Sequence, residues 1–146
     1  MKTQIVLASH GSLAEGMVTA VRMVIREAAD EIWAYGLDRW ETPQNIRRQL
    51  ELEMEQNPRD CYMILSDIKG GSVANELMPM CARKGILLAT GMNLAMVISA
   101  VLHSQSGSEC TKELLEGVLN EVREGISCYD ASDFTDIKEK GDGELW

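Results

Sequence analysis

The sequence predicts an α/β fold with an open, mostly parallel, doubly wound sheet and helices on both faces. Short apolar runs alternate along the chain with longer segments of helical periodicity, and this order is typical of parallel sheets with crossover helices. The run Cys61–Ser66 is apolar without alternation, as expected of a strand buried on both faces. Because right-handed crossovers leave few topologies, we expect the strand order 2-1-3-4.

The first half of the chain supplies two strands and two helices. Gln4–Ser9 is a β-type run, and Leu13–Ala29 carries an apolar stripe at helical spacing. Glu31–Leu37 is expected to contain the second strand. Thr42 is the expected N-cap of the helix Pro43–Gln56, since proline suits the first helical position and Asn57-Pro58 ends the pattern.

The second half continues the alternation after the strand Cys61–Ser66. First we expect a helix capped by Ser72 that runs to about Arg83, and then a strand Ile86–Ala89, which begins after Gly85. A helix Leu94–Leu102 follows, and after it a helix capped by Ser108 that runs through Arg123. Gly125 ends that helix, and Ile126–Tyr129 is expected to be a short fifth strand. We expect residues 1–129 to form one domain and residues 130–146 an acidic, polar, partly disordered tail.

Composition and charge narrow the possible functions. A formal net charge of −9 argues against a nucleic-acid partner. The four cysteines lie in apolar segments without CxxC spacing, so we expect free thiols, no metal site and a cytoplasmic location without a signal segment. The chain is long enough to bury a hydrophobic core without the help of disulfide bonds or a bound metal. The methionines expected in that core are Met78, Met80, Met92 and Met96.

The functional residues are expected where the strand order reverses, beyond the carboxyl ends of the first and third strands. Ser9-His10-Gly11-Ser12 and Asp67-Ile68-Lys69-Gly70-Gly71-Ser72 follow these two strands. A neutral imidazole at His10 can attack phosphorus, while a carboxylate at Asp67 fixes its tautomer. Taken alone, a histidine at the position of His10 can equally be a surface or capping residue without a function, and Asp67 can equally be a residue that forms the turn.

The neighbouring residues fit a bound phosphoryl group. Gly70 and Gly71 allow close approach of backbone N–H groups, and the hydroxyls of Ser72 and Ser12 are further candidates for phosphate binding. The rim of the site is expected to include Ser9, Gly11, Lys69, Met92 and Asn93. Asn93 is alternatively a candidate helix N-cap, and Lys69 is alternatively a solvated residue of the turn. His103 is expected to have only a structural role, as a residue near the C-terminus of a helix.

Three motifs resemble those of the enzyme IIA domains of the mannose–fructose–sorbose class of the bacterial phosphoenolpyruvate-dependent sugar phosphotransferase system. They are Ile5-Val6-Leu7-Ala8-Ser9-His10-Gly11 with Ala14-Glu15-Gly16, Ser66-Asp67-Ile68-Lys69-Gly70-Gly71-Ser72-Val73-Ala74-Asn75, and Gly91-Met92-Asn93-Leu94-Ala95-Met96. The resemblance covers about Lys2–Tyr129. The chain departs from the family pattern at Ser9 (usually Thr), Lys69 (often apolar or aromatic), and Val73 and Ala95 (usually Pro).

The resemblance implies a phosphoryl carrier that needs no cofactor. His10 would accept phosphate from the histidine phosphocarrier protein and pass it to enzyme IIB, Asp67 would orient His10, and Ser72 would lie beside the phosphoryl group. Membrane subunits would be reached only indirectly. The resemblance also implies a homodimer in which Ile126–Tyr129 pairs with the partner's sheet. Apolar residues around a shallow crevice, with Met17, Met92 and Met96 as candidates, would suffice for protein partners.

Other functions remain open at this point. A phosphoryl-donor subunit of a dihydroxyacetone kinase has the same fold and the same use of histidine. A regulatory module that uses the phosphohistidine as a signal is a second alternative. A flavodoxin-like nucleotide binder is disfavoured, because no basic, glycine-rich phosphate loop follows the first strand.

Overall fold

The computed structural model describes residues 1–140, with side chains through residue 135. Its centre is a four-stranded parallel sheet in the order β2-β1-β3-β4, which confirms the predicted topology. The strands are β1 (Thr3–Ser9), β2 (Trp33–Gly36), β3 (Cys61–Ser66) and β4 (Ile86–Ala89). Ala8 of β1 is paired with Ser66 of β3. The chain therefore leaves these two central strands side by side, at the same edge of the sheet.

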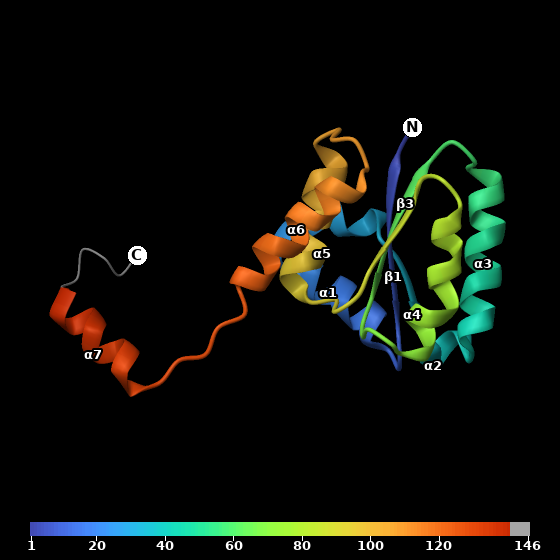
Figure 1. Cartoon of the computed structure of the whole chain (residues 1–146). Helices are drawn as coiled ribbons and strands as arrows, with labels where there is room; N and C mark the ends of the chain where they lie inside the picture. Colours follow the sequence, from blue (N-terminus) through green and yellow to red (C-terminus); the bar gives the residue numbers. More distant parts are fainter. Residues whose placement is uncertain (141–146) are drawn as a thin grey trace.

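Helices cover both faces of the sheet (Figure 1). One face carries α1 (Leu13–Ile25), α5 (Leu94–Gln105) and α6 (Lys112–Glu124), and the other carries α2 (Leu37–Trp40), α3 (Pro43–Gln56) and α4 (Ser72–Leu77). Two 3-10 segments, η1 (Arg26–Glu31) and η2 (Met78–Ala82), follow α1 and α4. The first helix therefore ends at Ile25 and not at the expected Ala29, because Arg26 has a φ of 50°, which an α-helix does not continue.

The two faces of the central strands build two separate apolar clusters. Ile5 and Leu7 of β1 point toward α1, α5 and α6, whereas Val6 and Ala8 point toward α3 and α4. Because both faces are covered, both sets of side chains are apolar, which explains the lack of alternation in β1 and β3. The expectation of a core strand at Cys61–Ser66 is confirmed to the residue.

Two of the expected helix caps are present. The Thr42 hydroxyl accepts a hydrogen bond from the Asn45 N–H at 3.1 Å, and the Asn93 side chain accepts one from the Met96 N–H at 2.9 Å. Asn93 thus fixes the start of α5 at the edge of the sheet where β1 and β3 end. The capping alternative for Asn93 is confirmed.

The predictions of Ser72 and Ser108 as helix N-caps are wrong. Gly71 occupies the N-cap of α4, with an extended backbone, and Ser72 is the first residue of the helix. Thr111, and not Ser108, caps α6, because its hydroxyl accepts from the Leu114 N–H at 3.1 Å. In both cases the residue with extended φ and ψ directly before the first helical turn takes the cap.

Several side chains expected in the core lie elsewhere. Met92 and Met96 are buried, and Met80 packs partly against the core, but Met78 is 48% exposed on η2. All four cysteines are free, and Cys81 and Cys128 are exposed. Met78 and Cys81 are at the surface because η2 lies beyond the short helix α4, at the margin of the sheet.

The chain after α6 leaves the body of the protein (Figure 1). Residues 126–130 form no strand within residues 1–140 and lead to a helix, α7 (Ala131–Lys140), that stands apart from the sheet. The tail is therefore helical through Lys140, where partial disorder is expected from the sequence; residues 141–146 lie outside the described residues. No helix in the described part of the chain has the length and apolar character needed to cross a membrane.

The helix α3 offers a matched test of the core. Leu50 is fully buried against β1 and β3, whereas Leu52 on the same helix is 56% exposed. We expect Leu50→Ala to lower the free energy of unfolding by about 2–5 kcal/mol, since it removes buried methyl groups and leaves a cavity. Leu52→Ala should change it by less than about 0.5 kcal/mol. Urea unfolding followed by circular dichroism measures both; equal losses would contradict the assigned core.

Candidate functional site

The two segments that follow β1 and β3 meet through His10 and Asp67. One oxygen of the Asp67 carboxylate, Oδ2, accepts from the backbone N–H of His10 at 2.9 Å and contacts ring Nδ1 of His10 at 2.9 Å. The register of β1 and β3 causes this contact, because it ends both strands at the same level. The His10 side chain is 48% exposed and that of Asp67 is 11% exposed. The ring therefore faces solvent above a largely buried carboxylate.

The charge of Asp67 determines which nitrogen of His10 carries the proton. Burial alone would raise the pKa of Asp67, but hydrogen bonds from the backbone and ring of His10, the charge of that ring and a backbone hydrogen bond at Asp67 itself outweigh it and hold the pKa below its usual value. The carboxylate is thus ionised at neutral pH and acts as an acceptor. Nδ1 then carries the hydrogen, and Nε2 keeps a free lone pair.

Ser72 and Gly71 lie on the other side of the ring. Ser72 Oγ is 3.3 Å from His10 Nε2, the nitrogen with the free lone pair. A Cβ on Gly71 would lie 3.2 Å from His10 Cε1 and 2.6 Å from Ile68 Cγ2, so only glycine leaves room for the ring here. The Gly71 N–H already donates to the Ile68 carbonyl at 3.2 Å. Gly71 therefore provides space for His10 but no free donor.

Hydrogen bonds of the Ser9 side chain hold the loop that carries His10. The Ser9 hydroxyl is fully buried, donates to the His10 carbonyl at 2.9 Å and accepts from the Ala14 N–H at 2.7 Å. It therefore serves the backbone of the loop and the first turn of α1, and does not lie on the rim. Ser12 is the N-cap of α1, without a capping bond from its hydroxyl. Gly11, between them, has a φ of 53°, which a side chain would strain.

Comparison with protein families identifies this chain. The model of the family described as the fructose IIA component of the phosphotransferase system matches residues 4–119. The chain belongs to this family. A comparison with curated proteins gives no match.

Solved structures agree with the assignment to the IIA family. The chain is similar to the mannose/sorbose-specific IIA subunit from Enterococcus faecalis, with 26% identity, a TM-score of 0.73, and coverage of 89% of this chain and 96% of that one. Component EIIA from Streptococcus agalactiae is 20% identical, with a TM-score of 0.73 over 86% and 96% of the two chains. A IIA protein associated with the fucose utilization operon of Streptococcus pneumoniae is 17% identical, with a TM-score of 0.69 over 92% and 97%. The last two similarities concern the fold alone.

The rim of the site in this IIA protein differs in part from the expected one. Met92 and Met96 are buried and Met17 packs partly against the core, so these three do not present an apolar surface. The exposed apolar side chains next to the site loops are Leu13, Ile68 and Leu94. Lys69 is exposed and, with Asn93 and Gly91, lines one end of a groove that runs along β4. In residues 1–140 no cluster of His, Cys, Asp or Glu has the arrangement of a metal site.

One supporting residue was not singled out from the sequence. Asn75 of α4 donates through Nδ2 to the Gly70 carbonyl at 3.1 Å, and its N–H donates to the Gly71 carbonyl at 2.9 Å. These bonds fix the glycine turn that approaches the ring. The motif ending Val73-Ala74-Asn75 includes this residue, but only the turn geometry reveals what its amide does.

The low pKa of Asp67 predicts a dependence of stability on pH. Because the folded pKa lies below the unfolded value of about 3.9, the carboxylate stabilises the fold above that pH and loses this effect as pH falls through the folded pKa. We expect Asp67→Asn to lower the free energy of unfolding by about 1–2 kcal/mol at pH 5, because the charge-assisted hydrogen bonds are lost. The difference in free energy of unfolding between this variant and wild type should shrink toward pH 2. Urea unfolding at several pH values measures it; a difference that grows on acidification would contradict the assignment.

Proposed function

We propose that this IIA protein is a phosphoryl carrier in which His10 accepts a phosphoryl group on Nε2 and passes it on during sugar uptake. The observation that carries the proposal is the His10–Asp67 pair, with Nδ1 held by the carboxylate at 2.9 Å and Nε2 left without a hydrogen on a half-exposed ring. Membership of the IIA family supports the same reaction. Asp67 is the orienting residue and His10 the nucleophile.

The chemical step is a transfer between two nitrogen atoms. The Nε2 lone pair attacks phosphorus as the bond between phosphorus and the donor's nitrogen breaks, and no other group is gained or lost. The ring becomes positively charged as the new N–P bond forms. The Asp67 carboxylate, which accepts from Nδ1–H, stabilises that charge without taking the proton. In the transfer to the acceptor, a histidine nitrogen of enzyme IIB attacks phosphorus, the bond between phosphorus and Nε2 breaks, and His10 returns to the neutral ring with its hydrogen on Nδ1.

Several groups are placed to bind the phosphoryl oxygens. Ser72 Oγ lies 3.3 Å from Nε2, so it is beside the position that phosphorus would take. The N–H groups of Ser72 and Val73 belong to the first turn of α4 and have no acceptor within the helix. Gly70 and Gly71 bring this backbone close to the ring. Ser12 and Lys69 are the further candidates, as a hydroxyl at the start of α1 and as a positive charge beside the turn.

The partners of this protein are proposed to be other proteins of the transport system. The donor is the histidine phosphocarrier protein and the acceptor is enzyme IIB, while the membrane subunits are reached only through IIB. The half-exposed ring and the apolar side chains Leu13, Ile68 and Leu94 around it suit contact with a protein surface. No cofactor enters the step, and the reaction takes place in the cytoplasm.

The protein is also proposed to be a homodimer that exchanges residues 126–129. Within residues 1–140, the strand β4 lies at the edge of the sheet and is paired only with β3. A groove of about 480 Å³ beside it is lined by Leu88, Leu119 and Ile126, among others. Ile126 and Tyr129 are each 72% exposed. A second copy's residues 126–129 match the length of β4 and would cover both its free edge and these side chains. Residues 1–129 are then the carrier domain, with 130–146 as a tail.

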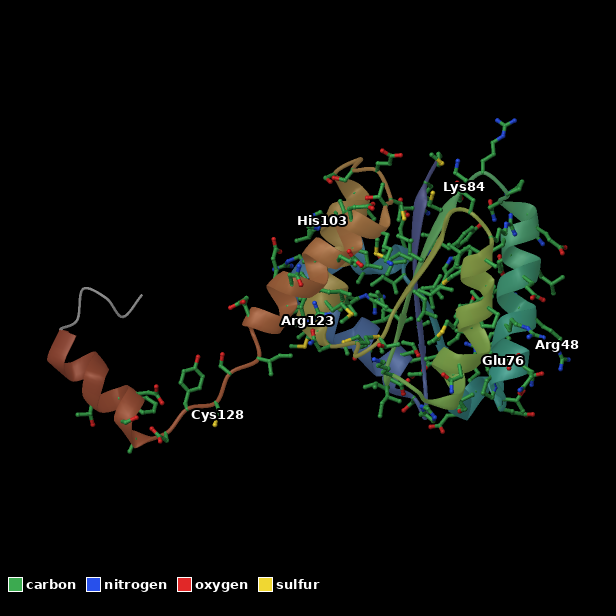
Figure 2. The ribbon with its side chains drawn as sticks, in the orientation of Figure 1. Arg48, Glu76, Lys84, His103, Arg123 and Cys128 are labelled. Atoms are coloured by element: carbon green, nitrogen blue, oxygen red, sulfur yellow. The ribbon has the colours of Figure 1, made fainter. Side chains whose placement is uncertain are left out.

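The phosphoryl transfer is tested by labelling the chain with phosphoenolpyruvate, enzyme I and the histidine phosphocarrier protein. Wild type should gain one acid-labile phosphate, and His10→Ala should gain none, because the nucleophile is gone. The control is His103→Ala, which removes the other of the two histidines in the sequence. His103 lies on α5 far from the site edge (Figure 2), so this variant should label fully.

The outcome also separates this function from its alternatives. Labelled protein that phosphorylates its cognate enzyme IIB supports the transport role. Delivery only to a nucleotide-bound kinase subunit would replace that role with the dihydroxyacetone kinase role. Equal labelling of His10→Ala and wild type would overturn the assignment of His10 itself.

The dimer is tested by removing the chain after Gly125. We expect wild type to have twice the mass of one chain in light scattering, and the truncated chain to be a monomer, because it lacks the exchanged segment. The body should remain folded, since every residue of both core clusters precedes Gly125. A full-length chain that is monomeric at micromolar concentration would contradict the exchange.

A further inference from the structure

Glu15 in the first turn of α1 has an unexpected partner. Ser12-Leu13-Ala14-Glu15 has the spacing of a capping box, in which the glutamate would reach back to the start of its own helix. The carboxylate turns instead to β2, and Oε1 accepts from the Gly36 N–H at 2.8 Å. Gly36 is the last residue of β2, which lies at the edge of the sheet. Glu15 therefore connects α1 to β2.

The other oxygen of Glu15 lies in a crowded, buried space. Oε2 is shielded from solvent and has no hydrogen-bond donor among the described residues. A Cβ on Gly36 would collide both with Glu15 Oε2 and with the carbonyl oxygen of Gly11. The Gly36 backbone thus touches the glutamate on one side and the residue after His10 on the other. The carboxylate and the Gly11 carbonyl are packed against the same glycine.

This packing reaches His10 through one peptide. Gly11 follows His10 directly, and its carbonyl accepts from the Asp38 N–H at 3.1 Å, just after β2. The end of β2 therefore determines where the Gly11 carbonyl can lie, and Glu15 holds the end of β2. Asp67 positions the ring from the β3 side, through Nδ1 and the backbone N–H. From the β2 side, the loop is held by the Asp38 N–H bond to the Gly11 carbonyl and by the close packing of Gly36 against that carbonyl.

We propose that Glu15 is a positioning residue for His10, acting through Gly36 and the Gly11 carbonyl to hold the ring with Nε2 free. The proposal rests on the proposed role of His10 as a nucleophile. Within the described residues, the hydrogen bond that Glu15 accepts comes from Gly36 and not from the ring of His10. Its removal should slow phosphoryl transfer at His10 while leaving donor binding unchanged, so kcat falls and KM does not.

A stabilising interaction with the helix dipole is the alternative explanation for Glu15. An acidic side chain in a first helical turn is favourable wherever it occurs. Glu113 is such a residue in the first turn of α6. Thr111, which caps that turn, lies beside Met1, Thr3 and Cys61, at the edge of the sheet opposite the site loops. Glu113→Ala is therefore the matched control, because it removes the same dipole interaction without touching the loop that carries His10.

The experiment compares Glu15→Ala and Glu15→Met with Glu15→Gln. Alanine and methionine remove the acceptor for Gly36, and methionine also fills the space. Glutamine keeps an acceptor for the Gly36 N–H and adds an amide donor that can face the Gly11 carbonyl, so it should rescue the function. Circular dichroism establishes that each variant is folded.

Reactivity of His10 is measured first without any partner protein. Potassium phosphoramidate phosphorylates the ring when Nε2 attacks phosphorus and ammonia leaves. We expect Glu15→Ala and Glu15→Met to react about tenfold more slowly than wild type, because a small displacement of a nucleophile has a large effect on rate. Glu15→Gln and Glu113→Ala should react within about twofold of wild type. Transfer from the histidine phosphocarrier protein should show the same pattern in kcat.

Nitrogen NMR of the imidazole rings supplies a readout that stability alone does not change. The sequence has two histidines, so His103 is an internal reference. Wild type should show His10 as the Nδ1–H tautomer, and the alanine and methionine variants should show a mixture of tautomers, with the His103 signals unchanged.

The inference is overturned if folded Glu15→Ala and Glu15→Met match wild type in rate and tautomer. It is also overturned if both variants unfold, because Glu15 then acts on stability. These outcomes are distinct from failure of the proposed function. A wild type that reacts with phosphoramidate in a Glu15-dependent manner, but takes no phosphate from the carrier protein, would refute the partner and keep the positioning role.

Discussion

One carboxylate oxygen, Asp67 Oδ2, holds both the backbone and the ring of His10. This double contact depends on two central strands that end at the same level, and hence on the whole parallel sheet. It also depends on the absence of a side chain at Gly71, where a Cβ would press against the ring. The sheet, the turn after β3 and the charge of Asp67 therefore act together on a single imidazole.

The order of elements could be predicted from the sequence because it depends on local pattern. The apolar run Cys61–Ser66 and the helix Pro43–Gln56 were placed to the residue. Their signals are a buried strand without alternation and a proline behind a threonine cap. The pairing of His10 with Asp67 also follows from topology, since parallel strands gather their carboxyl ends at one edge.

The details that were wrong or missed depend on tertiary contacts. Ser72 has the chemistry of a cap, but the backbone of Gly71 takes that position and the hydroxyl faces the ring. Ser9 resembles a residue of the rim, yet its side chain points beneath the loop because strand residues alternate in direction. Glu15 follows a local capping pattern, and only the position of β2 shows where its carboxylate goes. Periodicity and spacing carry no information on these contacts.

The open edge of β4 has a consequence for the order of assembly. Both core clusters are complete before residue 126, so each subunit can fold without its partner. In the proposed dimer, exchange of residues 126–129 would be a second-order encounter, slow in dilute solution and fast where subunits are made close together. A chain that donates its segment before it receives one still presents a free edge, to which a third chain can bind. Reciprocal exchange closes the pair, and one-way exchange leads to open-ended chains of subunits.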